Sequence, residues 1–168
     1  MADLARCPAR GESATASVCV RRATRGDLPA IVALLVDDEM GRSREPARLD
    51  PLPREYAAAF EAIDASPAAF LGVAELAGAV VGTFMITVIP GLSSLGQRKA
   101  LVEAVRTASA VRGRGVGSAM MAWAIELARR QGCGVVQLTT HKDRLDAHRF
   151  YERLGFHATH IGMKLTLR

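Results

Sequence analysis

Residues 111–117, Val111-Arg112-Gly113-Arg114-Gly115-Val116-Gly117, are the most informative stretch of this chain, and an apolar helical pattern from Ser118 to Gln131 follows at once. Glycine at every second position removes alternate side chains, so successive backbone N–H groups can turn toward one anion. The helix that begins there adds its own unpaired N–H groups and the positive end of its dipole. The stretch therefore predicts a cradle for a phosphate or pyrophosphate, with a plain tight turn as the alternative.

The spacing of these glycines disfavours two common phosphate-binding loops. A Walker loop requires G-x-x-x-x-G-K-[ST], and no Lys-Ser or Lys-Thr pair follows the glycines. A dinucleotide-binding loop requires G-x-G-x-x-G and an acidic residue at the end of the next strand. Here the last interval is too short, and the next strand pattern ends in Thr139-Thr140-His141. Neither a Walker-type nucleotide site nor a Rossmann-type dinucleotide site is favoured.

Composition indicates one ordinary domain and a modest positive charge. The chain has 168 residues and a formal net charge of +5, which is enough chain for a hydrophobic core. Because there is no long Lys/Arg run and no aromatic interleaving, we expect no nucleic-acid partner. No apolar run approaches the ~18 residues typical of a membrane span, so we expect no membrane partner either. Residues 1–17 are polar, and we expect a disordered leader there.

The cysteines and histidines give no metal-binding pattern. Cys7, Cys19 and Cys133 are scattered and form no C-x-x-C pair. This usage is typical of reduced thiols in a cytoplasmic protein, and it argues against a disulfide framework and against a zinc site. We therefore expect a cytoplasmic protein without a bound metal.

Hydrophobic periodicity predicts the element order β-α-α-β-β-β-α-β-α-β. The first helix follows a capping box at residues 24–27, and Gly132 and Gly155 end the last two helices. This order is that of an α/β fold with a mixed, mostly antiparallel central sheet and about four flanking helices, in a single domain over residues 18–168. The strands are expected at 18–21, 69–76, 80–89, 99–108, 134–140 and 161–167, and the later helices at 54–64, 118–131 and 145–154.

Two motifs together carry a resemblance to a known family. Arg112-x-x-Gly115-x-Gly117 resembles the pyrophosphate loop of the GCN5-related N-acetyltransferases (GNAT), and Ala147-His148-Arg149-Phe150-Tyr151-Glu152-Arg153-Leu154-Gly155-Phe156 resembles the family's A-x-x-[FL]-Y-E-x-L-G-F segment. The two occur in the family's order, and the likeness spans residues 18–167. It implies an N-acetyltransferase that moves an acetyl group from acetyl-CoA to a primary amine of a small molecule or peptide, by direct attack in a ternary complex.

The resemblance also implies where acetyl-CoA would bind. Its pantetheine arm would follow the strand near Val105, Arg106 and Thr107, where one backbone N–H would stabilise the oxyanion. The side chains of Arg112 and Arg114 have a solvated role as their alternative, because the family's loop binds chiefly through backbone. The pyrophosphate would lie on residues Arg112, Gly113, Arg114, Gly115, Val116, Gly117 and Ser118.

Tyr151 and Glu103 are the candidate catalytic residues. The family's matching tyrosine protonates the departing thiolate, so Tyr151 would be the general acid; the alternative is a core aromatic beside Phe150 and Phe156. Strand alternation places Glu103 on a mostly apolar face with Leu101, Val105 and Thr107. A carboxylate there is either a desolvated base, a member of an ion pair, or a residue facing water at an edge.

The candidate acceptor-binding residues are Asp38, Glu39 and His141. Asp37, Asp38 and Glu39 end the first predicted helix, where the dipole does not favour acids. At the mouth of the site they would attract a cationic amine, and the alternative is a solvated helix end. His141 follows the strand at 134–140 and is either a base, an acceptor contact or an ordinary loop histidine.

Two departures from the family pattern concern the C-terminal part. Arg144 stands where many members have an asparagine that holds the pantetheine. The chain after Phe156 is too short for the usual final hairpin, so the acceptor site is either open on that side or completed by a second subunit. This feature, with the apolar run at 84–89, suggests a possible homodimer. The alternatives to an enzyme are a non-catalytic coenzyme A-binding sensor or partner module and, from the net charge, a nucleic-acid-binding protein.

Overall fold

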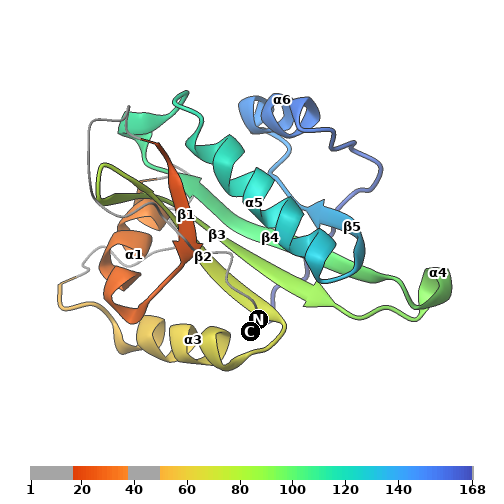
Figure 1. The fold of residues 1–168 in the computed structure, drawn as a ribbon, viewed down its shortest axis with the longest axis horizontal. Helices are drawn as coiled ribbons and strands as arrows, with labels where there is room; N and C mark the ends of the chain where they lie inside the picture. The colour runs from red at the N-terminus through yellow and green to blue at the C-terminus, as the bar shows by residue number, and fades with distance from the viewer. Residues whose placement is uncertain (1–16, 38–49, 168) are drawn as a thin grey trace. The chain divides into compact units, whose positions relative to one another are not determined.

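A five-stranded sheet in the order β1-β2-β3-β4-β5 forms the frame of the fold (Figure 1). Neighbouring strands from β1 to β4 are antiparallel. The last strand, β5, is reached from β4 through a helix, the connection that parallel neighbours require, and the sheet is mixed. The strands are β1 (Cys19–Arg22), β2 (Ala69–Leu76), β3 (Ala79–Ile89), β4 (Arg98–Thr107) and β5 (Cys133–Leu138).

The computed structural model describes residues 17–37 and 50–167, and every structural statement below refers to these. The leader expected at 1–17, apart from its last residue, and the candidates Asp38 and Glu39 lie outside them. The chain divides into two compact units, one ending at Gln137 and one beginning at Leu138. The expectation of one domain over residues 18–168 stays a prediction.

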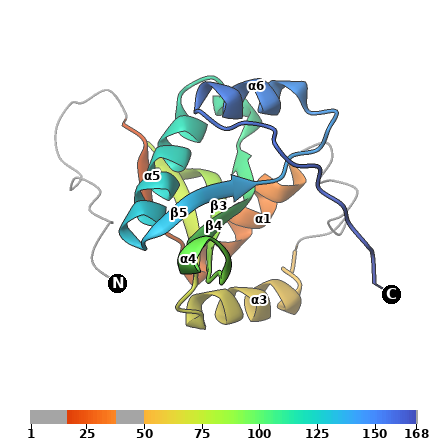
Figure 2. The same cartoon turned by 90° about the vertical axis from the view of Figure 1, so that its right-hand side faces the viewer.

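Helices lie on both faces of the sheet in the first unit. Figure 2 shows α5 on one side of the strands and α1 on the other, and α3 joins α1 through a shared apolar cluster. The second unit contains α6. The helices are α1 (Leu28–Val36), α3 (Arg54–Ala65), the short α4 (Ser93–Gly96), α5 (Val116–Arg130) and α6 (Leu145–Arg153), and the 3-10 turns are η1 (Arg25–Asp27) and η2 (Ser109–Val111).

An aromatic cluster fills the space between α5 and the sheet. The rings of Phe70 and Trp123 lie 4.4 Å apart between centroids, and Phe84 meets Trp123 edge-on at 5.7 Å. Phe84 and Met120 are fully buried. Burial of such side chains is worth roughly 1.5–3 kcal/mol each. A second buried cluster under α1 and α3 comprises Ala23, Leu28, Ile31, Phe60 and Val73.

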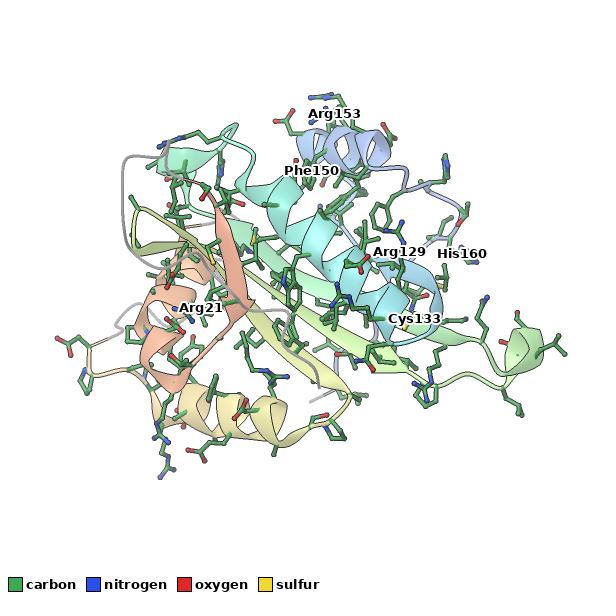
Figure 3. All side chains as sticks on the ribbon, in the orientation of Figure 1. Arg21, Arg129, Cys133, Phe150, Arg153 and His160 are labelled. Carbon is green, nitrogen blue, oxygen red and sulfur yellow. The ribbon has the colours of Figure 1, made fainter. Side chains whose placement is uncertain are left out.

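A cluster of charges ties β1 to the start of α1 and to β2. The guanidinium of Arg21 donates to both carboxylate oxygens of Asp27, at 2.7 and 2.9 Å, and to Glu75 at 2.5 Å. Thr24 donates its backbone N–H and its hydroxyl to Asp27 at 2.7 and 2.8 Å, which is the predicted capping box. The hydrogen bond from Arg21 outweighs burial and lowers the pKa of Asp27 from its ordinary 3.8 to about 2. Figure 3 labels Arg21 in this cluster.

Most predicted elements are confirmed, but the last strand is not. Residues 161–167 form neither strand nor helix. The alternation of apolar and polar residues predicts a strand there, but alternation alone does not form one, because a strand needs a partner for its backbone hydrogen bonds. The strand predicted at 134–140 exists as β5, yet it is not buried as expected, because it lies at the edge of the sheet and Val135 is 40% exposed. The apolar run at 84–89 offers little dimer surface, because Phe84 and Ile86 are core residues.

The cysteines differ from the expectation of reduced thiols. Cys19 in β1 is disulfide-bonded, whereas Cys133 at the start of β5 is a free thiol. Partial burial raises the pKa of the Cys133 thiol. The cysteines therefore no longer favour a reducing compartment.

We predict that replacing Asp27 by Asn destabilises the fold in a pH-dependent way. A carboxylate whose pKa is lower in the folded state stabilises the protein above its unfolded pKa, near 3.8, and this contribution is lost as the pH falls toward 2. We expect D27N to lose about 1 to 2 kcal/mol of unfolding free energy at pH 7, after allowance for solvent screening, and about half of that at pH 3.

Urea unfolding at the two pH values measures the effect, and Asp64→Asn is the matched control. Asp64 pairs with Arg22 at 3.2 Å, but its side chain is 53% exposed. We expect D64N to cost less than about 0.5 kcal/mol. An equal loss of unfolding free energy in D27N and D64N would show that the buried Arg21–Asp27 cluster stabilises the fold no more than an exposed ion pair does.

Candidate functional site

The glycine turn has the backbone geometry of an anion cradle. Gly113 and Gly115 adopt left-handed φ values of 79° and 80°, and nothing lies within 4 Å of a Cβ added at either position. Residues 112–115 are exposed, whereas Val116, the first residue of α5, is buried. No side chain caps the helix. The first N–H groups of α5 therefore face an open surface, as an anion site requires.

Close packing on β3 fixes where α5 begins. A Cβ on Gly82 would lie 2.8 Å from the sulfur of Met120 and 3.1 Å from Val116. The first contact is shorter than real Cβ contacts and the second is tighter than most of them, so a side chain at position 82 would require Met120 or Val116 to shift. Because the glycine turn leads directly into α5, the packing of α5 against Gly82 also sets the position of the turn.

A hydrogen-bonded clamp holds the 3-10 turn that precedes the glycines. The carboxylate of Asp37, at the C-terminal end of α1, accepts a hydrogen bond from the backbone N–H of Ser109 at 2.7 Å and one from its hydroxyl at 3.2 Å. Arg112 N–H then donates to the Ser109 carbonyl at 3.3 Å. The clamp joins the end of α1 to the entry of the anion cradle.

A bulge interrupts β4 where the resemblance places the pantetheine arm. Thr83 pairs with Arg106 and Met85 with Glu103, so Ala104 and Val105 together face the single residue Phe84. Ala104 has a φ of 51°, a left-handed value that costs a non-glycine residue roughly 1–2 kcal/mol. Such strained bulges re-aim backbone groups and gather at functional sites. The bulge turns backbone N–H and C=O groups of this segment out of the regular ladder.

The bulge corrects the expected surroundings of Glu103. One extra residue shifts the alternation, so Glu103 lies on the face of Met85 and Thr83, together with Arg106, whereas Thr107 lies opposite Gly82 on the α5 face. Glu103 is exposed. It does not share a face with Thr107, and of the alternatives left open, a position facing water fits best.

Tyr151 lies in an aromatic cluster of the second unit. Its ring meets Phe150 at 5.1 Å and Phe156 at 5.9 Å, both edge-on. Tyr151 is partly buried, and Gly155, with a left-handed φ of 87°, ends α6 as predicted. Phe156 N–H donates to the Tyr151 carbonyl at 3.1 Å. The cluster fixes the ring of Tyr151 within its unit, and its role as an acid stays a prediction.

His141 belongs to a local network before α6. Its ring Nδ1 lies 3.4 Å from the carboxylate of Asp143, and its carbonyl lies 2.9 Å from Nε2 of His148. Arg144, which replaces the family's asparagine, donates its backbone N–H to the same carbonyl at 3.0 Å. His141 is exposed and organises the turn into α6. Whether it also contacts an acceptor stays a prediction.

Within residues 17–37 and 50–167, no three His, Cys, Asp or Glu side chains gather as metal ligands. No helix in that part of the chain combines the length and apolar character needed to cross a membrane.

Sequence reasoning missed the close packing over Gly82, the bulge at Ala104 and the hydrogen bonds of Asp37 to Ser109. A signal existed only for Asp37, because an acid at a helix C-terminus is unfavourable unless another partner compensates. The contact of Gly82 with α5 and the bulge at Ala104 depend on long-range pairing, which local sequence does not encode.

Comparison with known proteins identifies the family. A sequence model described as the Acetyltransferase (GNAT) family matches residues 31–156. The chain is 46% identical over 51 residues to an aminoalkylphosphonate N-acetyltransferase of Salmonella typhimurium, spanning 30% of this chain and 33% of that protein. It is 32% identical over 90 residues to a glucosamine 6-phosphate N-acetyltransferase of Trypanosoma brucei brucei, spanning 54% of this chain and 59% of that one. The chain thus spans less than two thirds of the curated relatives it matches.

A solved structure gives the more complete match. The crystal structure of a protein described as a transcriptional regulator, from Bacillus halodurans C-125, is 46% identical, with a TM-score of 0.87. The match covers 90% of this chain and all of that one. The family model spans most of the chain, including the glycine turn and the Tyr151 segment. The chain therefore belongs to the GNAT acetyltransferase family.

Proposed function

We propose that this chain is an acetyl-CoA-dependent N-acetyltransferase that acetylates a small primary amine. The observation that carries the proposal is the open glycine turn at the N-terminus of α5, in a chain of the acetyltransferase family. Left-handed Gly113 and Gly115 leave room for a pyrophosphate at the helix dipole. The exposed Arg112 and Arg114 add positive charge beside it. The open backbone and the positive charge of the turn support the proposal that it binds the coenzyme's pyrophosphate.

Three chemical tasks follow for such a transfer. The amine must lose a proton, the tetrahedral oxyanion needs a hydrogen-bond donor, and the thiolate leaves more easily when it is protonated. Backbone N–H groups near the bulge at Ala104 and Val105 are candidates for the oxyanion, because the bulge takes them out of the regular ladder. Tyr151 is the proposed acid for the thiolate. Since Glu103 is exposed, we propose that water relays the amine proton to a carboxylate or to solvent.

The names of the two curated relatives suggest the class of acceptor. An aminoalkylphosphonate and glucosamine 6-phosphate both combine an amine with a phosphorus-bearing anion. The formal net charge of +5 would favour such an anionic acceptor over a polyamine. We therefore propose a small amine that carries a phosphate or phosphonate. The proposed role of Asp38 and Glu39 in drawing in the ammonium group is compatible with this class.

A second candidate is a coenzyme A-binding sensor without catalysis. It is favoured by the Bacillus halodurans protein, which is described as a transcriptional regulator and matches over nearly the whole chain. A sensor would need the same coenzyme cradle but no acceptor site. The two candidates therefore differ in turnover and not in coenzyme affinity.

A panel of amines with detection of free thiol separates these candidates. We expect an aminoalkylphosphonate and glucosamine 6-phosphate to be acetylated with kcat/KM about 10-fold or more above that of the matched amines lacking phosphorus, through charge pairing. Equal kcat/KM values for the amines with and without phosphorus would contradict the proposed acceptor class. Coenzyme binding without thiol release across the panel would favour the sensor.

Gly117→Asp tests the cradle. A carboxylate in the first turn of α5 would lie beside the bound pyrophosphate, so we expect the Kd for acetyl-CoA to rise by about 10-fold or more. Calorimetry or the ligand-induced rise in thermal midpoint measures it. Ala122→Asp adds the same charge at an exposed position of the same helix and should leave the Kd unchanged. An unaltered Kd in G117D would place the coenzyme elsewhere.

Tyr151→Phe tests the proposed acid. Removal of a general acid is expected to lower kcat by about 10- to 100-fold. Because the ring is kept, the packing against Phe150 and Phe156 and the Kd for acetyl-CoA should not change. A full kcat in Y151F would mean that water protonates the thiolate.

A further inference from the structure

The connection between β4 and α5 is hydrogen-bonded to other elements of the first unit at two neighbouring residues. Ala108 N–H donates to the Val81 carbonyl of β3 at 2.9 Å, which continues the sheet. Ser109, the next residue, donates its N–H and its hydroxyl to the carboxylate of Asp37. The backbone hydrogen bonds that follow, at residues 111–114, stay within the connection itself. Among the described residues, Asp37 is therefore the last hydrogen-bond anchor before the glycine turn.

Asp37 is itself held in place by a packed helix. It is the C-cap residue of α1, and its own N–H donates to the Ala33 carbonyl at 3.0 Å. One face of α1 is buried through Ile31, Val32 and Leu34. Because α1 and α5 lie on opposite sides of the sheet (Figure 2), the carboxylate ties the connection to the helix layer opposite the one that it enters. The glycine turn is thus anchored to a second, separately packed element.

The charge of Asp37 is unfavourable where it stands. A carboxylate at a helix C-terminus faces the negative end of the helix dipole. It also brings a negative charge to the entry of a turn that is proposed to bind a pyrophosphate. Its charge alone would weaken anion binding, whereas its two hydrogen bonds would hold the turn in one geometry. The two effects predict opposite changes in coenzyme affinity when the carboxylate is removed.

We infer that Asp37 is a positioning residue for the coenzyme, because it fixes the connection at Ser109 and so orders the glycine turn before acetyl-CoA binds. The inference rests on the proposed function. Among the described residues, no backbone carbonyl accepts the N–H groups of Gly113, Gly115 and Gly117, so these donors are available to a ligand. A turn that is ordered in advance spares the ligand the entropic cost of ordering it. Loss of the anchor therefore weakens coenzyme binding and leaves the chemical step nearly unchanged.

Asp37→Ala tests the inference by calorimetry with coenzyme A and by steady-state kinetics. We expect D37A to raise the Kd for coenzyme A and the KM for acetyl-CoA by about 5- to 10-fold, with kcat changed less than about 2-fold. Asp37→Asn removes the charge but keeps one acceptor, so its Kd should lie between those of D37A and the native chain. Unchanged or tighter binding in D37A would mean that Asp37 acts through its charge alone or not at all, which overturns the inference.

Asp64→Ala is the matched control for the loss of one negative charge. Asp64 lies on α3, and its side chain is 53% exposed. D64A should leave both the Kd for coenzyme A and the KM for acetyl-CoA unchanged. An equal rise of Kd in D64A and D37A would overturn the inference, because the effect would then not depend on the contact with Ser109. Far-UV circular dichroism checks that each variant is folded.

Two substitutions of Ser109 test the contact from its other side. Ser109→Pro removes both donors, and proline suits the first residue of η2 because Ala108 before it is extended, with φ −50° and ψ 134°. Ser109→Ala removes only the hydroxyl and keeps the shorter bond from the N–H. We expect S109P to raise the Kd as D37A does, and S109A to change it less than about 2-fold. In D37A/S109P the rise should not exceed that of either single variant, and fully additive rises would overturn the inference.

Hydrogen exchange separates a failure of this inference from a failure of the proposed function. Without ligand, the Ser109 amide should exchange more slowly in the native chain than in D37A. Equal exchange would mean that the anchor is absent in solution, which overturns the inference whatever the coenzyme does. A native chain that binds no coenzyme A at millimolar concentration overturns the proposed function and the positioning role with it. Native affinity in D37A overturns the positioning role alone.

Discussion

The close contact of α5 with β3 is the constraint on which the site depends. Gly82 allows Val116 and Met120 to approach the sheet, and the aromatic cluster of Phe84 and Trp123 holds the rest of the helix in place. Since the first turn of α5 would also form one wall of the proposed anion cradle, the packing of the core also sets the geometry of that cradle. A larger residue at position 82 would move both together.

The segment from β4 to α5 joins two irregular backbone features, which we propose bind the same ligand. The bulge at Ala104 turns backbone groups out of the sheet, and the left-handed glycines at 113 and 115 turn others toward the helix end. Between them, the Asp37–Ser109 clamp holds the connecting turn. In this arrangement the backbone provides most of the proposed donors. The residue types therefore say little about the oxyanion site. Among the proposed catalytic groups, the side chain of Tyr151 is the one whose role a substitution can test most directly.

Much of the fold could be predicted from the sequence, because many helix and strand boundaries depend on residues that are close together in the chain. The capping box at Thr24, the breaks at Gly132 and Gly155, and the hairpin near Gly78 follow from short-range hydrogen bonding and glycine conformation. The predictions that were wrong concern tertiary pairing. Alternation placed Glu103 with Thr107, but the bulge shifted the register by one. Alternation also predicted a strand at 161–167, but a strand exists only where another strand accepts its hydrogen bonds.

By itself, the sequence determined the family, the glycine turn before α5 and the position of Tyr151 on α6, because these depend on short motifs whose geometry is local. Only the tertiary structure decided that Glu103 is exposed and that Asp37 binds Ser109. It also decided that residues 161–167 form no strand. These properties arise from pairing between residues far apart in the chain, where a single inserted residue changes which face a side chain occupies.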